Sequence, residues 1–574
     1  MTSPDRGDRP NILVLCMDQW DVHMDLPAGV DLPAIQRLTG AGVSLENQYC
    51  SVPQCTPSRA TMWTGQHAKN VGLWDNTNFA WTDVLDEQVP TVGTMLRQQG
   101  YYTAYKGKWH LSHPPRSRDA LECYGFSDYQ QWGDNWGGPL QGEMLDGTVA
   151  FETVDWLRHK RPQETPWFLV SSMVNPHDIM FLRAGEDEEA HRNGALAPLT
   201  HPQQDLGFMR EYDVELPENF DDDLDAQPYG VRSYKRNTEW NYGSIPQGRE
   251  DLWKARRNYL INCLRMVDQE FQKILDELDR LDLWRDTVVL FTSDHGEMNG
   301  AHGLAQKGAI PFQEASVVNM TVVSPQGPSG VRSDAVGSHL DLAPTFLSWA
   351  GLSQAQIREQ YPQLKGRDLR QVFEAPEEAQ PPRGSASAPG DGALISWDGL
   401  NMLDPEWAIQ GALSELTQLG DGPAKTLEDC RAVGQTYGAP DMDKRTFFRA
   451  VSDGRHKLVR WFSPTQYRTP STVEELHDTS DVALYDLAAD PGEMQNLGDP
   501  SHPDYDEARV REMLAKLRKL IETEVGEDQC PFDLDLFGTR EVRYRLEDIT
   551  AGAPAGGQPT EPGPAAASTG SGAG

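Results

Sequence analysis

Several polar residues stand where the expected folding of the chain would bring them together. Asp18 and Asp294 each follow a buried apolar run directly, and Asn175 follows a third. In a parallel sheet covered by helices, ligands bind at the carboxyl ends of the strands. These residues therefore indicate a site at one edge of a sheet. The alternative is structural, because an acid after a strand is also a common N-cap of the next helix.

Lys108 and His110 form a second pattern, since they are separated by one residue after a short apolar segment. On a strand, alternate side chains share a face, so both could reach one pocket. A solvated lysine and a surface histidine are the alternative interpretation.

Cys55, Pro57 and Arg59 form a third pattern, Cys-x-Pro-x-Arg. It matches the signature read by the enzyme that oxidises cysteine to formylglycine (3-oxoalanine). Five-residue matches arise by chance, and a structural cysteine before a Pro-stiffened turn has the same appearance. The functional interpretation depends on whether the other motifs support it.

Taken in order, the motifs resemble the sulfatase family of the alkaline phosphatase superfamily. The similar segments span roughly residues 11–497: Asp18-Gln19, Cys55 to Gly65, Lys106 to Leu111, Asn175 to Asp178, Thr292 to Gly296, Gly303 to Gly308, and a structural C-terminal signature from Leu484 to Leu497. The resemblance implies a formylglycine-dependent hydrolase that cleaves a small-molecule sulfate ester to alcohol and sulfate. It also implies maturation by the formylglycine-generating enzyme, and related cytoplasmic enzymes suggest a homo-oligomer.

The resemblance assigns roles residue by residue. Cys55, as the aldehyde hydrate, would be the nucleophile, and Arg59 would bind it. Lys108 and Lys307 would contact the sulfate, and His110 would act as a base. His177 would contact the leaving-group oxygen. One divalent metal ion would be held by Asp18, Gln19, the modified Cys55, Asp294 and His295. Oxygen ligands favour Ca²⁺.

Two of these positions depart from the commonest sulfatase pattern, which has Asp in place of Gln19 and Asn in place of His295. Gln19 makes the set of metal ligands less negative. A histidine nitrogen is a better ligand for Mn²⁺ than for Ca²⁺. The pattern is nearest to the choline-sulfatase and phosphonate-monoester-hydrolase branch. A phosphonate monoester or phosphodiester hydrolase is therefore an alternative, and a non-catalytic anion-binding homologue is a minor one.

The elements that would position these residues alternate between strand and helix. Strands are predicted at 11–17, 101–106, 167–174 and 287–292, and helices at 32–39, 91–98 and 250–281. This alternation predicts a mostly parallel sheet covered on both faces, as in an alkaline-phosphatase-like α/β/α sandwich. Residues 178–249 are acidic and weakly periodic, and we expect them to pass over the site. Together with residues 401–440 they should supply the pocket walls.

The C-terminal part predicts a smaller α+β domain with an antiparallel sheet. A hairpin is expected over 447–462 with its turn at Asp453-Gly454, then a strand at 484–487 and a helix at 508–525. We place the catalytic domain at 9–372, a linker or exposed loop at 373–391, the C-terminal subdomain at 392–545 and a disordered tail at 552–574.

Composition excludes several function classes. The net charge of −36 argues against nucleic acid or an anionic membrane as partner. An anionic substrate would then need positive charges and a metal within the site. The 7 cysteines are scattered along the chain, and this spacing argues against a disulfide framework and against a zinc site. The first apolar run is too short for a signal peptide, so we expect a cytoplasmic protein.

Overall fold

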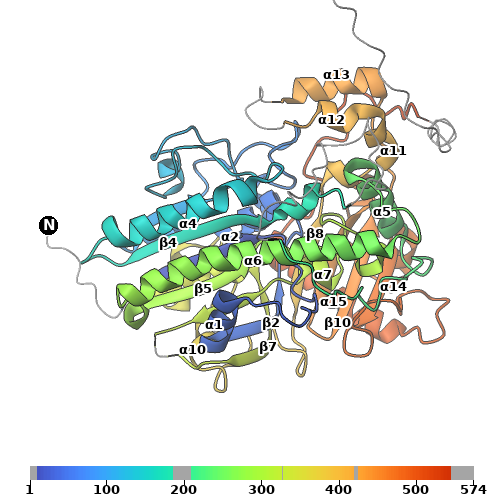
Figure 1. Ribbon diagram of the computed structural model, residues 1–574. Helices are drawn as coiled ribbons and strands as arrows, with labels where there is room; N and C mark the ends of the chain where they lie inside the picture. Colours follow the sequence, from blue (N-terminus) through green and yellow to red (C-terminus); the bar gives the residue numbers. More distant parts are fainter. Residues whose placement is uncertain (1–8, 185–208, 326, 419–424, 545–574) are drawn as a thin grey trace, which may run out of the picture.

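The computed structural model describes residues 9–184, 209–325, 327–418 and 425–544 (Figure 1). Its centre is a seven-stranded sheet in the order β3-β4-β1-β5-β6-β2-β7. All neighbouring strands in it are parallel except those that pair with β6. The strands are β1 Asn11–Asp18, β2 Val43–Tyr49, β3 Tyr102–Gly107, β4 Trp167–Pro176, β5 Thr287–Ser293, β6 Met320–Val323 and β7 Val331–Ser338.

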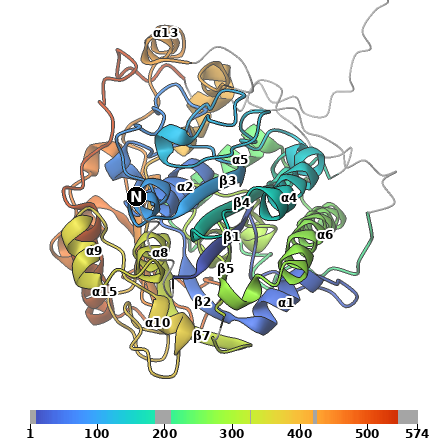
Figure 2. The ribbon, with the colours of Figure 1, turned by 90° about the vertical axis from the view of Figure 1, so that its left-hand side faces the viewer.

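Helices cover both faces of this sheet, as Figure 2 shows. Alternate residues of β1 identify the two faces, because strand side chains point to opposite sides. Leu13 and Leu15 pack with α1 (Pro33–Ala41), α4 (Gln141–His159) and α6 (Glu250–Arg280). Ile12 and Val14 pack with α2 (Cys55–Thr64), α3 (Val92–Gln98) and α8 (Leu342–Trp349). All eight residues of β1 are buried, which fits its continuous apolar sequence.

A second sheet is antiparallel, in the order β11-β10-β9-β8. Its strands are β8 Ala393–Trp397, β9 Phe447–Ser452, β10 His456–Phe462 and β11 Asp481–Asp486. One face packs on α15 (Glu507–Leu520), and the other joins the core shared with β1. The remaining helices are α5 Tyr229–Tyr242, α7 Gln313–Ser316, α9 Gln354–Gln360, α10 Arg370–Glu374, α11 Pro405–Trp407, α12 Leu413–Glu415, α13 Leu427–Tyr437 and α14 Val473–Thr479.

The predicted fold class is confirmed, as are the strands and helices expected from periodicity, each within a few residues of its predicted ends. The hairpin turn at Asp453-Gly454 is also confirmed. One local expectation is wrong: β3 ends at Gly107, so Lys108 and His110 do not lie on a strand. The domain boundaries stay a prediction, and the expected tail at 552–574 lies outside the described residues.

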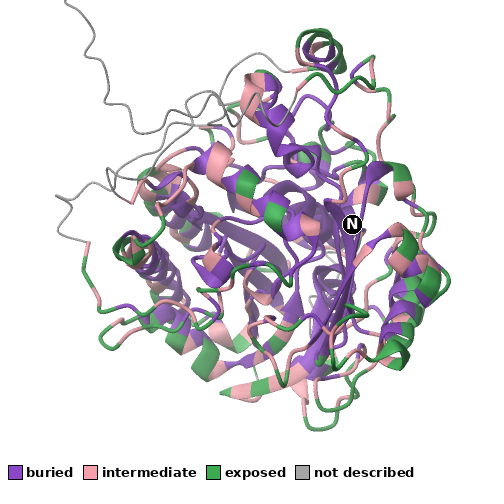
Figure 3. Cartoon of the chain, turned by 90° about the vertical axis from the view of Figure 1, so that its right-hand side faces the viewer, coloured by how far each residue is buried: buried purple, intermediate pink, exposed green. Residues whose placement is uncertain are grey.

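The central strands are buried along their length, whereas the outer helices alternate buried and exposed residues (Figure 3). This is the pattern of an amphipathic helix that packs one face on a sheet. Among the described residues, no helix is both long and apolar enough to cross a membrane.

Buried ion pairs fasten the C-terminal chain to the body of the protein. Arg449 on β9 donates to Asp398 at 2.8 Å and to Asp528 at 2.8 Å, and Lys69 pairs with Asp528 at 2.6 Å. Arg383, in the segment expected to be a linker or exposed loop, is fully buried between Asp341 and Glu524. Residues near 524–528 are therefore anchored to the body through charge.

The Asp528 carboxylate should contribute a pH-dependent share of stability. Burial raises its pKa, but Arg449 and Lys69 outweigh that effect and hold the pKa at about 2. A carboxylate whose pKa is lowered by folding stabilises the fold at pH values above its unfolded-state pKa. This stabilisation is lost as the pH falls through the folded-state pKa. We expect Asp528→Asn to lower the free energy of unfolding by about 2 kcal/mol at pH 7, and by roughly half of that at pH 3.

Urea unfolding at both pH values measures this difference. The control is Asp535→Asn, an exposed residue, which should leave the midpoint nearly unchanged. A loss that is equal at both pH values would show that the ion pairs do not cause the effect.

Candidate active site

The predicted acids meet the predicted cysteine at the carboxyl edge of the central sheet. Asp18 ends β1, Asp294 follows β5, and Cys55 is the first residue of α2. One ligand atom from each of Asp18, Cys55, Asp294 and His295 lies within 4.8 Å of the others. All four side chains are buried, and the Cys55 sulfur lies 3.1 Å from His295 Nε2 and 3.7 Å from Asp18 Oδ1.

Arg59 holds the two carboxylates in place. It lies one helical turn after Cys55 on α2, so the two side chains project on the same side of the helix. Its Nε lies 2.8 Å from Asp294 Oδ2 and its Nη2 lies 3.1 Å from Asp18 Oδ2. Nη1 donates to the Lys108 carbonyl at 2.8 Å and to Ser172 Oγ at 2.9 Å. Since Arg59 is fully buried and its donors are occupied, it orders the cluster from behind.

Lys108 and His110 reach the site from a turn. Lys108 Nζ pairs with Asp18 Oδ2 at 2.5 Å. Asp134 accepts from the backbone N–H groups of Trp109 and His110, each at 2.8 Å, and so fixes the turn in which His110 has a φ of 57°. His110 Nε2 lies 2.7 Å from Asn78 Oδ1. Asp134 and Asn78 carry no local sequence signal, because each acts on a residue distant in the chain.

Gln19 lies beside the acidic cluster, but its side chain is bound to other residues. Its amide nitrogen donates to Glu297 Oε2 at 2.5 Å, and its amide oxygen accepts from Lys307. Glu297 in turn pairs with Arg256 at 2.9 Å. The Gln19 amide therefore links Lys307 to the buried Glu297–Arg256 pair.

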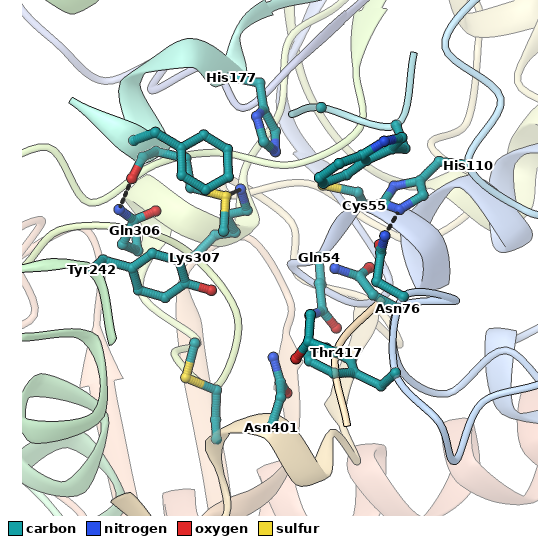
Figure 4. A pocket seen from close by; sticks show the side chains of 17 residues that line it. Gln54, Cys55, Asn76, His110, His177, Tyr242, Gln306, Lys307, Asn401 and Thr417 are labelled. Atoms are coloured by element: carbon teal, nitrogen blue, oxygen red, sulfur yellow. Dashed lines mark hydrogen bonds between the residues drawn. The ribbon is translucent and has the colours of Figure 1, made fainter. Parts of the chain in front are cut away.

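His177 and Lys307 line a pocket that opens over Cys55, together with His110 (Figure 4). Met180 and Tyr242 come from the segment 178–249 and Asn401 from the segment 401–440, so both segments contribute walls as expected. Asp178, next to His177, accepts from the backbone of Gly142 and Glu143 at the start of α4. Its role is to anchor that helix.

Burial and neighbouring charges shift the pKa values of the titratable groups in the site. Burial lowers the pKa of both His110 and His177 far below the usual histidine range, and Lys108 lowers them further. Both rings are therefore neutral near pH 7. Burial also lowers the pKa of Lys307, whereas Asp18 overcomes the burial of Lys108 and raises the pKa of that lysine. Burial raises the Cys55 pKa, but Lys108 and Lys307 more than offset it, so the thiol pKa is lowered.

The donor set fits a divalent cation. Two carboxylates and a histidine nitrogen converge with the Cys55 side chain, and oxygen ligands of this kind suit Ca²⁺ or Mn²⁺. Asp18 and Asp294 are buried close enough for Asp18 to raise the pKa of Asp294, although burial is the larger cause. A cation between them would relieve that repulsion.

Comparisons with known proteins show the family to which the chain belongs. The profile of the sulfatase family matches residues 10–352. The choline-sulfatase of Rhizobium meliloti is 25% identical over 480 residues, which cover 79% of this chain and 90% of that protein. The uncharacterized sulfatase YidJ of Escherichia coli is 28% identical over 377 residues, covering 61% of this chain and 69% of the relative.

Solved structures show the same fold. A 2-O GAG sulfatase superimposes with a TM-score of 0.62 and 20% identity, over 90% of this chain and 93% of that one. The phosphonate monoester hydrolase of Agrobacterium radiobacter does so with a TM-score of 0.58 and 20% identity, over 90% and 97%. With the family profile matching more than half of the sequence, the chain belongs to the sulfatase family of sulfuric ester hydrolases.

Proposed function

We propose that the protein hydrolyses sulfate esters of small molecules and that Cys55, oxidised to formylglycine, carries the reaction. The position of Cys55 supports this most strongly. It begins α2, its sulfur lies within 4.8 Å of one candidate ligand atom from each of Asp18, Asp294 and His295, and it lines the pocket together with Lys307 and the two histidines. The aldehyde hydrate would supply one oxygen for attack on sulfur and a second hydroxyl through which sulfate is released.

The chain's own residues divide the remaining work. Lys108 and Lys307 would neutralise the sulfate oxygens, and Arg59 keeps both carboxylates in their positions. Lys307 is a suitable proton donor to the departing alcohol, because burial lowers its pKa. His177 would bind the same oxygen. His110 is neutral and oriented by Asn78. It would accept the proton of the second hydroxyl of the hydrate, and loss of that proton would allow sulfate to be released.

One divalent cation would be held by Asp18, Asp294, His295 and the modified Cys55, next to the Gln19 amide oxygen. When bound, it would polarise the sulfate oxygens and lower the pKa of a coordinated hydroxyl. Maturation by the formylglycine-generating enzyme, a cytoplasmic location and a homo-oligomeric state stay predictions.

A second function has a specific observation in its favour. Gln19 and His295 depart from the commonest sulfatase pattern, and a phosphonate monoester hydrolase shares the fold. The same residues could act on phosphonate monoesters or phosphodiesters. Comparing kcat/KM for the sulfate and the phosphonate ester of one alcohol distinguishes the two functions, and we expect the sulfate ester to react faster.

Removing the Cys55 side chain should abolish turnover. We expect Cys55→Ala to lower kcat for a sulfate ester by about 10⁴-fold or more, because the nucleophile is lost. The matched control is Cys50→Ala, another buried cysteine, whose thiol pKa is raised well above its usual value by burial. That variant should keep kcat within about threefold. Comparable loss in both variants would assign the effect to folding.

Metal content should depend on the acidic cluster. We expect Asp294→Asn to reduce bound divalent metal, measured by elemental analysis of the purified protein, because it removes a charged oxygen ligand. Asp178→Asn is the control: this carboxylate is equally buried but faces the start of α4. Equal metal content in the two variants would place the metal elsewhere.

The dependence of kcat on pH should reflect the protonation state of His110. Since its pKa lies well below the usual range, the ring accepts protons at pH 7, and kcat should stay level as pH falls from about 8 to about 6.5. His110→Ala should lower kcat about 100-fold or more. His113→Ala, an exposed neighbour, should have little effect. An unchanged kcat in His110→Ala would remove this residue from the mechanism.

A further inference from the structure

The ammonium group of Lys307 is held by a buried amide rather than by a carboxylate. It donates to the Gln19 amide oxygen and lies 3.2 Å from Met180 Sδ. Among the described residues no carboxylate forms an ion pair with Lys307, whereas Lys108 pairs with Asp18 at 2.5 Å. The position of the Lys307 ammonium group therefore depends on the orientation of one amide.

The neighbours of the Gln19 amide determine which way it faces. An ammonium group only donates hydrogen bonds, so the atom that faces Lys307 is the amide oxygen. An ionised carboxylate only accepts them, so the atom that faces Glu297 is the amide nitrogen, 2.5 Å from Oε2. Gln19 and Glu297 are fully buried. An amide turned the other way would set donor against donor without access to solvent, which is costly.

Glu297 is itself held by donors that leave its second oxygen to Gln19. Its Oε1 accepts from Arg256 Nη2 at 2.9 Å and from the backbone N–H of Gln306 at 2.9 Å. Gln306 directly precedes Lys307 in the chain. Glu297 therefore acts on Lys307 at two points, the backbone beside it and the amide that binds its ammonium group.

This arrangement gives a physical reason for a glutamine at position 19. The commonest sulfatase pattern has a second aspartate there, which would face Glu297 with no donor between the two carboxylates. Gln19 supplies a donor to Glu297 and an acceptor to Lys307 at the same time. A carboxylate at position 19 cannot do both, so residues 19 and 297 form a matched pair.

Resting on the proposed function, we propose that Glu297 is a positioning residue that acts through Gln19 and directs the Lys307 ammonium group to the leaving-group oxygen. Lys307 lines the pocket together with Cys55, whereas Glu297 lies outside the described residues that line it (Figure 4). Glu297 therefore acts without touching the substrate. Removing its charge impairs the departure of the alcohol and leaves the nucleophile in place.

Glu297→Gln tests this role because it reverses the orientation of both amides. Arg256 and the Gln306 N–H need an acceptor, so the introduced oxygen faces them and the introduced NH₂ group faces Gln19. Gln19 must then turn its oxygen toward position 297 and its own NH₂ group toward Lys307. Two donors face each other, and the ammonium group moves away from its place.

The effect is read from the dependence of kcat/KM on the leaving group. Ring-substituted phenyl sulfates are compared on the matured enzyme, from a nitrophenyl ester, whose phenol is acidic, to a methoxyphenyl ester, whose phenol is a weak acid. A misplaced proton donor costs most when the leaving alcohol is a weak acid. We expect Glu297→Gln to lower kcat/KM for the methoxyphenyl ester at least fivefold more than for the nitrophenyl ester, with unchanged divalent metal content.

Both esters are measured on one preparation, so loss of folded protein cancels in their ratio. An equal loss for the two esters would overturn the proposal. A loss of bound metal that accompanies the loss of activity would also overturn it, because Glu297 would then act through the metal.

A charge-conserving exchange is the second test. In the double variant Gln19→Glu with Glu297→Gln, the introduced carboxylate accepts from both the introduced amide and Lys307, so the hydrogen bond between the two positions is restored in the reverse direction. We expect this variant to recover the wild-type ratio of the two esters to within threefold, whereas Gln19→Glu alone, with two facing carboxylates, does not. The comparison needs no folded Glu297→Gln protein. A double variant whose ratio is no closer to the wild-type value than that of Gln19→Glu would contradict the pairing.

Glu493→Gln is the matched control. This glutamate is also fully buried, pairs with Lys457 at 2.5 Å and lies outside the described residues that line the pocket. The control should preserve the ratio of the two esters, and a change as large as that in Glu297→Gln would overturn the specific role of Glu297. A wild-type enzyme that cleaves none of the phenyl sulfates would instead contradict the proposed function. The corresponding phenyl phosphonates would then give the same comparison for Glu297.

Discussion

The site depends on the burial of opposite charges at the carboxyl edge of the central sheet. Asp18 and Asp294 are fully buried, and Arg59 bridges them from α2 with contacts of 3.1 and 2.8 Å. Taking such charges out of water is costly unless every partner is present and well placed. Because the partners come from β1, β5 and α2, the cluster forms only when the sheet and the helix behind it have assembled. The same constraint sets Cys55 at the start of α2 against the acids.

Much of the fold follows from local pattern, and the reason is burial. Strands such as β1 and β5 are covered on both faces, so their sequences are continuous apolar runs that are visible without structural information. The amphipathic pattern of α6 can likewise be predicted from the sequence. Because parallel strands end at one edge, the sequence predicts that the acids directly after these strands meet, and Asp18 and Asp294 do meet.

The parts that sequence could not predict all depend on contacts between distant segments. Lys108 and His110 were expected on a strand, but β3 ends at Gly107 and the turn is fixed by Asp134. That Gln19 holds a metal stays a prediction, and the contacts of its amide with Glu297 and Lys307 have no local sequence signal. No local periodicity encodes such partners.

The proposed function requires that residue 55 works as an aldehyde rather than a thiol. Mass spectrometry of the peptide that contains Cys55, from protein produced together with the formylglycine-generating enzyme, tests it most directly. We expect a peptide in which sulfur is replaced by oxygen and two hydrogens are lost, in a preparation that hydrolyses sulfate esters. An unmodified thiol in a fully active preparation would contradict it.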